Sequence, residues 1–283
     1  MYKALSLSII VGSALMLTAC ANGDDPNQQT TTIDNDTTNT YEQNNHEVNN
    51  QEEAVNIANN DEGNTYNNDE GNEEKESEPL YKLDNSEVRP IDDAEEQVVL
   101  LTIDDAPDNY SVEMAESLKA LDAGAIFFVN GHFLESEQGR ADLQHLYDLG
   151  FEIGNHTMTH QDLTTLSEEE QYEEIVELND LIEEVIGERP RFFRAPFGKN
   201  TSYSTQLVED ENMQWMNWTY GYDFVEEYME KEALTDVMVD APELRNGANL
   251  LMHDREFTRD ALEDIVRGLR EKGYDIVAPE TIE

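Results

Sequence analysis

Short apolar runs alternate with longer amphipathic segments between residues 96 and 283, a pattern that predicts alternating strands and helices. The predicted strands are residues 98–103, 125–129, 151–154, 192–195, 213–218, 249–252 and 274–277. The predicted helices are residues 112–121, 139–149, 167–186, 203–210, 235–244 and 258–272. Seven strands that alternate with helices predict a parallel sheet with right-handed crossovers. Because the segment has nearly 190 residues, we expect the sheet to close, or nearly close, into a barrel.

The longest predicted helix, residues 167–186, has the clearest helical spacing of apolar residues. These residues are Tyr172, Ile175, Val176, Leu178, Ile182 and Ile186. Ser167 and Glu170 form a capping box, which predicts that the helix begins directly after Ser167.

The first 20 residues have the layout of a secretory signal, with an early Lys3 and an apolar run too short to span a membrane comfortably. They end in Leu17-Thr18-Ala19-Cys20, which resembles a bacterial lipobox, in which the cysteine is acylated and becomes the first residue of the mature chain. The resemblance implies export and a lipid anchor at Cys20 on the outer face of the cytoplasmic membrane. A plain signal peptide with an incidental cysteine is the alternative.

Residues 21–95 contain 21 acidic and 3 basic residues and almost no large apolar ones. Such a segment cannot offset its folding entropy by burial, so we expect a disordered acidic tether. As a flexible coil it would span roughly 50 Å. The sequence therefore predicts three parts: a signal peptide over 1–20, a tether over 21–95 and one folded domain over 96–283.

The whole chain has a formal net charge of −47. This charge excludes a nucleic-acid binder held by phosphate contacts, and it argues against electrostatic docking on an anionic membrane. We therefore expect contact with the membrane only through the lipid anchor. Cys20 is the single cysteine, so no intramolecular disulfide can form, and we expect a monomer held by an ordinary core.

Polar residues gather where the predicted strands end, which is where barrels of this kind place their chemistry. In chain order, the five groups are Thr102-Ile103-Asp104-Asp105, Asn155-His156-Thr157-Met158-Thr159-His160, Arg194-Ala195-Pro196-Phe197-Gly198, Tyr222-Asp223-Phe224 and Leu250-Leu251-Met252-His253-Asp254. This ordered set resembles the motifs of the polysaccharide deacetylases, carbohydrate esterase family 4 with the NodB-homology domain, over nearly all of residues 96–283. The resemblance implies a distorted (β/α) barrel and the metal-dependent removal of N-acetyl, sometimes O-acetyl, groups from sugar polymers.

A metal site is predicted at the ends of two strands. His156 and His160 are four residues apart, so in a helical turn both imidazoles would project from one face and could share an ion. Asp105 adds a carboxylate, and two histidines with one carboxylate leave positions open for water and substrate. The ligand set fits Zn²⁺ best and also admits Co²⁺, Fe²⁺ or Mn²⁺.

Adjacent carboxylates at Asp104 and Asp105 would repel each other unless one of them is neutralised. A metal bound to Asp105 would do so and leave Asp104 as a general base, the role that the resemblance also implies. Arg194 is the natural partner that keeps Asp104 ionised and oriented. The alternatives are that one aspartate only caps a turn and that Arg194 forms a purely structural ion pair.

Further roles follow from the resemblance alone. It implies that the backbone N–H of Phe197 and the metal stabilise the oxyanion, in a loop shaped by Pro196 and Gly198. It also makes Leu251 a wall of the acetyl pocket.

A general acid is needed to protonate the leaving amine, and we expect His253 to supply it. Asp223 is the expected carboxylate that raises its basicity and fixes its tautomer. The alternative for His253 is a buried histidine of the core. Trp215 is expected in the core, as is Trp218, although the position of Trp218 would also let it flank a sugar.

The chain departs from the family pattern at positions that leave every chemical group in place: Ile103, Ala106, Phe197 and Phe224. These changes concern the identity of the substrate more than activity. We expect an N-deacetylase of cell-wall polysaccharide, with peptidoglycan N-acetylglucosamine as the nearest substrate. A chitooligosaccharide deacetylase, an O-acetyl polysaccharide esterase and a lipoprotein that only binds glycans through a relic site are the alternatives.

Overall fold

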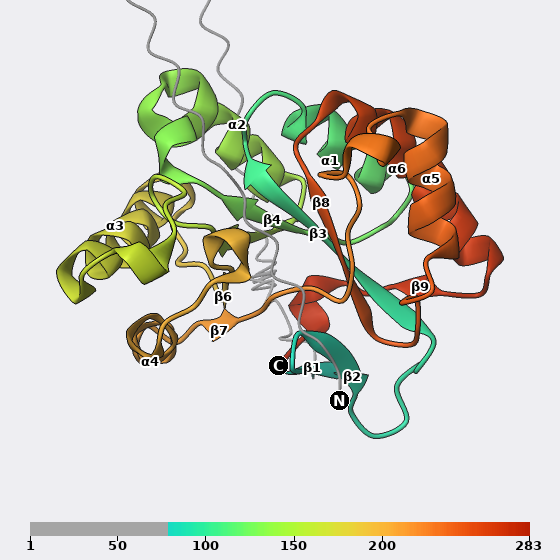
Figure 1. Ribbon diagram of the computed structural model, residues 1–283, viewed down its shortest axis with the longest axis horizontal. Coiled ribbons are helices and arrows are strands. Elements are labelled where there is room, and N and C mark those ends of the chain that lie inside the picture. Colours follow the sequence, from blue (N-terminus) through green and yellow to red (C-terminus); the bar gives the residue numbers. More distant parts are fainter. Residues whose placement is uncertain (1–78) are drawn as a thin grey trace, which may run out of the picture. The chain divides into compact units, whose positions relative to one another are not determined.

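The computed structural model describes residues 79–283, which form a curled parallel sheet surrounded by helices (Figure 1). The main sheet has the strand order β7-β6-β5-β4-β3-β8, and β9 pairs with the start of β3. Its strands are β3 (Val98–Ala106), β4 (Ile126–Val129), β5 (Glu152–Asn155), β6 (Phe192–Phe193), β7 (Gln214–Trp215), β8 (Ala248–His253) and β9 (Asp275–Ile276). Every neighbouring pair runs parallel, so the predicted seven-stranded parallel sheet is confirmed.

The helices also fall where the apolar spacing predicts them. They are α1 (Ser111–Ala120), α2 (Glu137–Asp148), α3 (Glu168–Ile186), α4 (Ser202–Asp210), α5 (Lys231–Asp240) and α6 (Glu256–Glu271). The capping box at the start of α3 is confirmed, with Ser167 and Glu170 each accepting a hydrogen bond from the backbone N–H of the other. Only α5 is clearly displaced, since it begins four residues before the predicted start.

The segment that follows β7 crosses to β8 and brings the two ends of the sheet together. Tyr220 forms a parallel bridge with Leu250, and the N–H of Leu251 donates to the carbonyl of Tyr220 at 2.9 Å. The approach is so close that a Cβ on Gly221 would lie 2.5 Å from the Leu251 oxygen, so only glycine fits there. The sheet therefore closes into the distorted (β/α) barrel that was expected.

The two faces of β3 have different surroundings, as the alternation of side chains in a strand requires. The residues that pack against the outer helices are Val99, Leu101 and Ile103. The residues that point into the barrel are Val98 and Leu100, in a second apolar cluster with Phe128 and Phe192. Thr102 and Asp104 continue this inward row and are buried. The barrel interior is therefore apolar at one end and polar at the carboxyl ends of the strands.

A bulge in β3 changes the direction of its last side chains. The three steps from Ile103 to Ala106 match only two steps along β4, so β3 carries one extra residue. Asp105 lies in this bulge with a left-handed φ of +64°. In a regular strand, Asp104 and Asp105 would point to opposite faces, whereas the bulge lets both carboxylates line one cleft.

A hairpin of β1 (Tyr81–Asp84) and β2 (Glu87–Pro90) closes the barrel at the end opposite the strands' carboxyl ends. Val88 is fully buried in the interior cluster, and its N–H donates to the carbonyl of Gly247 at 2.8 Å. The hydroxyl of Ser86 accepts from the N–H of Asn217 at 2.7 Å. The hairpin is therefore part of the domain.

This hairpin corrects the predicted boundary of the tether. Residues 79–95 were assigned to a disordered segment, but they carry two strands and core side chains. The composition of this stretch suggested disorder because most of its residues are polar. Only a few apolar residues, Tyr81 and Val88 among them, are buried in the core. The predicted signal peptide, Cys20 and the tether as far as residue 78 lie outside the described residues.

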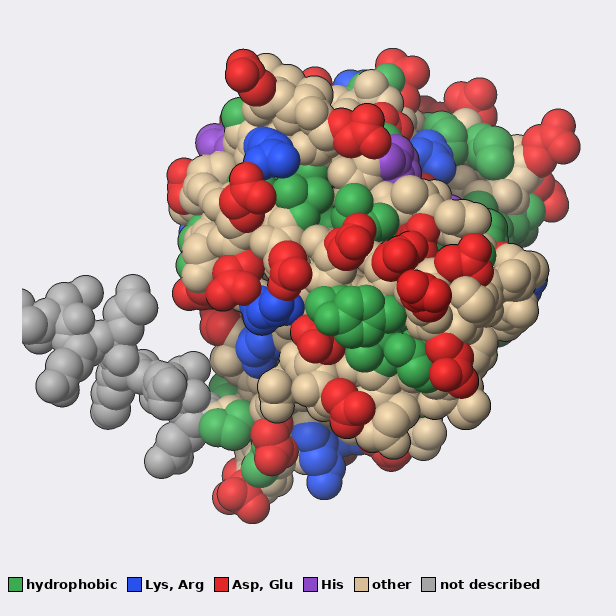
Figure 2. Space-filling model, turned by 90° about the vertical axis from the view of Figure 1, so that its left-hand side faces the viewer, with side chains coloured by type: hydrophobic (Ala, Val, Ile, Leu, Met, Phe, Trp, Pro, Cys, Tyr) green, Lys and Arg blue, Asp and Glu red, His purple; other side chains and the backbone are tan. Residues whose placement is uncertain are grey.

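No helix within residues 79–283 has the length and apolar character needed to cross a lipid bilayer. Acidic side chains are scattered over the face that Figure 2 shows, with far fewer basic ones between them. This distribution matches the 43 acidic and 13 basic residues of positions 96–283.

Candidate active site

A cleft of about 640 Å³ opens at the carboxyl ends of the strands. The predicted site residues that line it are Asp104, Asp105, His156, His160, Asp223 and His253, together with the apolar Phe197 and Leu251. Arg194 is fully buried and pairs with Asp104, while Pro196 and Gly198 flank Phe197. Residues from the ends of β3, β5, β6 and β8 and from the segment after β7 are thus brought to one place.

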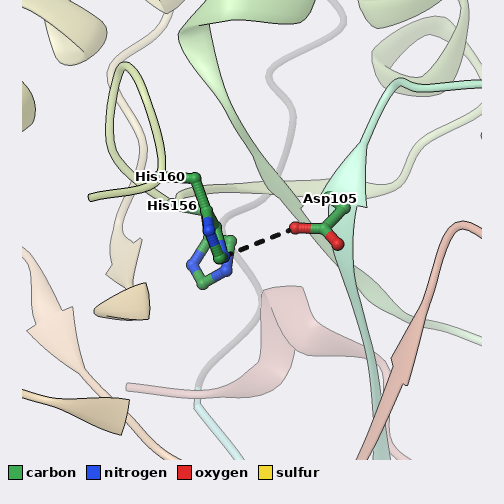
Figure 3. Close-up of side chains that lie close together, drawn as sticks. All are labelled: Asp105, His156 and His160. Carbon is green, nitrogen blue, oxygen red and sulfur yellow. Dashed lines mark ion pairs between the residues drawn. The ribbon is translucent and has the colours of Figure 1, made fainter. Parts of the chain in front are cut away.

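Three side chains are placed to hold a metal ion. Each of Asp105, His156 and His160 offers one ligand atom, and these atoms lie within 4.8 Å of one another (Figure 3). The Nδ1 of His156 lies 2.6 Å from the carbonyl oxygen of Arg194, to which it donates, so Nε2 is left for the ion. Burial lowers the pKa of His156 despite the nearby carboxylates, which favours the neutral imidazole that ligates metals. The two nitrogens and one carboxylate therefore fit a divalent transition-metal ion.

The loop that carries both histidines is not the predicted helical turn. Thr157 and His160 have left-handed backbone conformations, with φ of +72° and +57°. The side chain of Asn155 accepts from the N–H of Thr157 at 2.9 Å, and the Thr157 hydroxyl accepts from the N–H of His160 at 3.1 Å. Glu174 of α3 accepts from the N–H of Thr159 at 2.8 Å. Side-chain hydrogen bonds, rather than helical spacing, bring the imidazoles together.

Arg194 occupies the centre of a buried polar network inside the barrel. Its Nη1 donates to Asp104 Oδ1 at 2.7 Å and to the Thr102 hydroxyl at 2.8 Å. Its Nη2 donates to the carbonyl of Asn217 at 2.9 Å and to Asn249 Oδ1 at 3.3 Å. The guanidinium therefore ties together β3, β8 and the crossing segment after β7.

Asp104 is held in its ionised form by this network. Burial alone would raise its pKa, but the charge of Arg194, with a smaller contribution from His253 and the hydrogen bond from Arg194, lowers it below the ordinary value. Asp104 is also in register with His253 on the neighbouring strand β8, so a candidate base and a candidate acid stand side by side.

His253 is held by Asp223 through two contacts. Its Nδ1 lies 2.7 Å from Asp223 Oδ1, and its backbone N–H donates to Asp223 Oδ2 at 2.6 Å. The hydroxyl of Thr258 donates to the same carboxylate at 3.0 Å. Burial would lower the pKa of His253, but the hydrogen bond and charge of Asp223 raise it above its usual value. The raised pKa favours the imidazolium form, which is the form that a general acid requires.

The outer wall of the cleft is apolar and partly aromatic. Phe197 is 60% exposed and has a left-handed φ of +59°. Trp218 lines the cleft rather than the core and lies against Gly198. Trp215 was also expected in the core, but it is 39% exposed because it lies on the edge strand β7.

Several residues of the site were not predicted. Asp254 is buried, and its carboxylate accepts from the N–H groups of Tyr110 at 2.7 Å and Ser111 at 2.8 Å, which holds the segment after the bulge. Arg255 forms an ion pair with Asp105 at 2.9 Å. Asp254 stands in the fifth motif, which was its only signal. No feature of the sequence indicated that Arg255 contacts Asp105.

Comparison with known proteins gives the family. The model of the polysaccharide deacetylase family matches residues 92–216. The peptidoglycan-N-acetylmuramic acid deacetylase PdaC of Bacillus subtilis is 30% identical over 193 residues, covering 68% of this chain and 40% of that protein. A peptidoglycan-N-acetylglucosamine deacetylase of Bacillus cereus is 28% identical over 219 residues, covering 71% of this chain and 76% of that protein. The chain thus spans less than half of PdaC and about three quarters of the second relative.

Solved structures agree with this assignment. The structure of PdaC is 30% identical with a TM-score of 0.56, covering 65% of this chain and 88% of that chain. A wild-type pseudoenzyme of carbohydrate esterase family 4 from Bacillus anthracis is 29% identical with a TM-score of 0.58, covering 64% and 63%. The chain belongs to the polysaccharide deacetylase family, carbohydrate esterase family 4, as its motifs suggested.

The neighbouring aspartates should respond differently to substitution when metal content is measured. Asp105→Ala removes one of three ligands, so we expect most of the bound metal to be lost. Asp104→Asn leaves all three ligands in place and keeps a side chain that can accept from Arg194, so we expect nearly full occupancy. Elemental analysis of both variants after loading with zinc checks this. Metal loss in Asp104→Asn, or full occupancy in Asp105→Ala, would mean that the two roles are reversed.

Proposed function

We propose that this protein is a metal-dependent hydrolase that removes N-acetyl groups from the amino sugars of cell-wall polysaccharide, peptidoglycan above all, and releases acetate. One observation carries the proposal. A candidate base, a metal-ligand group and a candidate acid line the same cleft, each with the partner that its role requires.

Each side chain has a role in hydrolysis of the acetamide. Asp104, kept ionised by Arg194, takes a proton from the attacking water. His253, charged with the help of Asp223, donates a proton to the leaving amine. Leu251, which is buried at the base of the cleft, contacts the acetyl methyl group.

A metal complements these residues. An ion held by Asp105, His156 and His160 would act as a Lewis acid that polarises the acetyl carbonyl. We propose Zn²⁺ as this ion, with Co²⁺, Fe²⁺ or Mn²⁺ as alternatives that the same donor set admits. The backbone N–H of Phe197 adds a hydrogen-bond donor for the oxyanion.

The apolar wall suits a sugar chain as the substrate. Phe224 is 52% exposed, and its ring packs edge-on against His253 with the ring centroids 5.9 Å apart. Trp218 and Met229 extend this wall. Aromatic faces present apolar surface to the C–H groups of a pyranose ring, while the polar strand ends receive its acetamide.

An O-acetyl esterase would use the same residues, and one observation favours the amide. An amine leaves only when it is protonated, whereas an alcohol depends less on protonation by a general acid. The Asp223–His253 pair raises the pKa of His253, which favours the protonated imidazolium that can give a proton to the amine. The names of the relatives, peptidoglycan deacetylases of two Bacillus species, point to the same chemistry and substrate. A chitooligosaccharide is the simpler alternative substrate.

A glycan-binding protein with a relic site is the non-enzymatic alternative. The likeness to a pseudoenzyme shows that the fold alone does not imply catalysis. The complete constellation argues for an active enzyme: Asp104, Asp105, His156, His160, Arg194, Asp223 and His253 are all present and in contact with partners. A relic would usually lack at least one of them.

We propose further that the protein is exported, is anchored by a lipid at Cys20 and acts as a monomer, which would place the cleft next to the wall. Cys20→Ser should move the protein from the membrane fraction to the soluble fraction of the cells without changing its turnover. A variant that stays bound to the membrane would contradict the anchor. The sedimentation of the released protein tests whether it is a monomer in solution.

The proposed reaction is tested on wall material itself. Peptidoglycan treated with the purified protein and then digested to small fragments should lose acetyl groups, as measured by mass spectrometry. Treatment with a chelator should abolish the loss, and added zinc should restore it. Fragments that keep every acetyl group in the presence of metal would exclude the proposed activity. Loss of acetyl groups that continues in the presence of the chelator would exclude a role for the metal.

A further inference from the structure

The two oxygens of the Asp105 carboxylate have different partners. Oδ1 faces His160 and lies 3.7 Å from its Nε2, a contact that Figure 3 marks with a dashed line. Oδ2 accepts a hydrogen bond from Nη2 of Arg255 at 2.9 Å. Within residues 79–283, this is the one hydrogen bond that the carboxylate accepts. One oxygen therefore lies on the side of the imidazoles, and the other is held by a cation.

Asp105 has little else to fix its direction. It lies in the bulge of β3 with a φ of +64°, where the pairing with β4 loses its regular register. The regular ladder that orients side chains elsewhere in a strand is interrupted at a bulge. A carboxylate that ligates a metal is normally oriented by a hydrogen bond from a second residue. Among the described residues, Arg255 is the residue that supplies this hydrogen bond.

Arg255 is itself held in place relative to β3. It directly precedes α6, and its Nη1 donates to the carbonyl of Asp254 at 3.0 Å. The N–H of Asp254 donates to the carbonyl of Asp104 at 3.0 Å. The buried carboxylate of Asp254 accepts from the successive N–H groups of residues 108–111. The start of α6 is thus fixed to the chain on both sides of Asp105.

A guanidinium next to a metal ligand has two opposite effects on the ion. Its charge repels a divalent cation, whereas its hydrogen bond orients the ligand. The side chain of Arg255 is 43% exposed, so water and salt screen the repulsion. The side chain of Asp105 is only 16% exposed, and the hydrogen bond acts on it directly. The orienting effect should therefore outweigh the repulsion.

We propose that Arg255 is a positioning residue for the metal: it holds Oδ2 of Asp105, so that the carboxylate presents Oδ1 alone to an ion shared with His156 and His160. The inference rests on the metal dependence of the proposed function. Arg255 acts through Asp105 and need not contact the substrate.

The affinity for zinc tests this role without any catalytic assay. Metal-free protein competes with a coloured chelator for Zn²⁺, and we expect Arg255→Gln to bind the ion about 10- to 100-fold more weakly than wild type. Arg255→Lys keeps a charged donor and should restore part of the affinity. Arg267→Gln, at an exposed arginine of α6 that pairs with Glu263, is the matched control and should bind zinc as wild type does. Unchanged or tighter binding by Arg255→Gln would overturn the proposal.

A double-mutant cycle shows whether Arg255 acts through Asp105. In the Asp105→Asn background the carboxylate is absent, so adding Arg255→Gln should change the zinc affinity by no more than about threefold. A further loss as large as in the wild-type background would mean that Arg255 acts by another route, and would overturn the proposal.

Cobalt gives a spectroscopic readout of the same contact. The visible absorption of Co²⁺ weakens as more ligands join the ion, and a carboxylate released from Arg255 can offer both oxygens. At equal metal content, cobalt-loaded Arg255→Gln should absorb less strongly than wild type, while Arg267→Gln should keep the wild-type spectrum. Identical spectra for wild type and Arg255→Gln would contradict the one-oxygen arrangement.

Thermal unfolding of the metal-free proteins separates positioning from general stability. An ion pair with an exposed arginine contributes little, so Arg255→Gln should unfold within about 4 °C of wild type. A much larger fall would make Arg255 a structural residue and overturn the proposal.

The failure of this inference and that of the proposed reaction can be told apart. If zinc binding depends on Arg255 as expected but the wild-type protein releases no acetate, the deacetylase function fails and the role of Arg255 stands. If acetate is released while Arg255→Gln binds zinc as tightly as wild type, the role of Arg255 fails and the function stands.

Discussion

The structure of this site depends on one buried ion pair, between Arg194 and Asp104. The guanidinium is fully buried, and its Nη1 and Nη2 groups donate hydrogen bonds to Asp104, Thr102, Asn249 and a carbonyl of the crossing segment. These contacts offset most of the cost of burying the charge, although Nε has no partner among the described residues. Removing one partner of such a pair typically costs about 3–5 kcal/mol, because it leaves the other charge without compensation. The interaction that joins the strands inside the barrel is thus also the one that keeps the candidate base ionised.

The chemistry of the cleft follows from the alternation of strand side chains and from one departure from it. Inward positions on β3 and β8 place Asp104 beside His253, and the same rule brings Arg194 inside from the end of β6. The bulge at Asp105 breaks the alternation and adds a second carboxylate to the same side. Two adjacent aspartates can therefore take different roles, because one pairs with an arginine and the other stands with two imidazoles.

The sequence predicted the strands, the helices and the residues of the cleft because each has a local signal: apolar periodicity, a capping box, or polar residues directly after a buried strand. Features that depend on long-range contacts were missed. The β1–β2 hairpin depends on a few buried side chains in a polar stretch, and the histidine loop is held by Glu174 of helix α3. Arg255 could not be recognised, because its partner Asp105 lies 150 residues away in the chain.

The central claim is that Asp104 acts as the base in an active, metal-dependent site and not in a relic. The most direct test is the rate of acetate release from an acetylated chitooligosaccharide by zinc-loaded wild-type protein and by zinc-loaded Asp104→Asn. The wild-type protein should turn over, and the variant should be slower by about 10²–10⁴-fold at equal metal content. Equal rates would contradict the role of Asp104, and a fully loaded wild-type protein that releases no acetate from this sugar or from peptidoglycan fragments would make the site a relic.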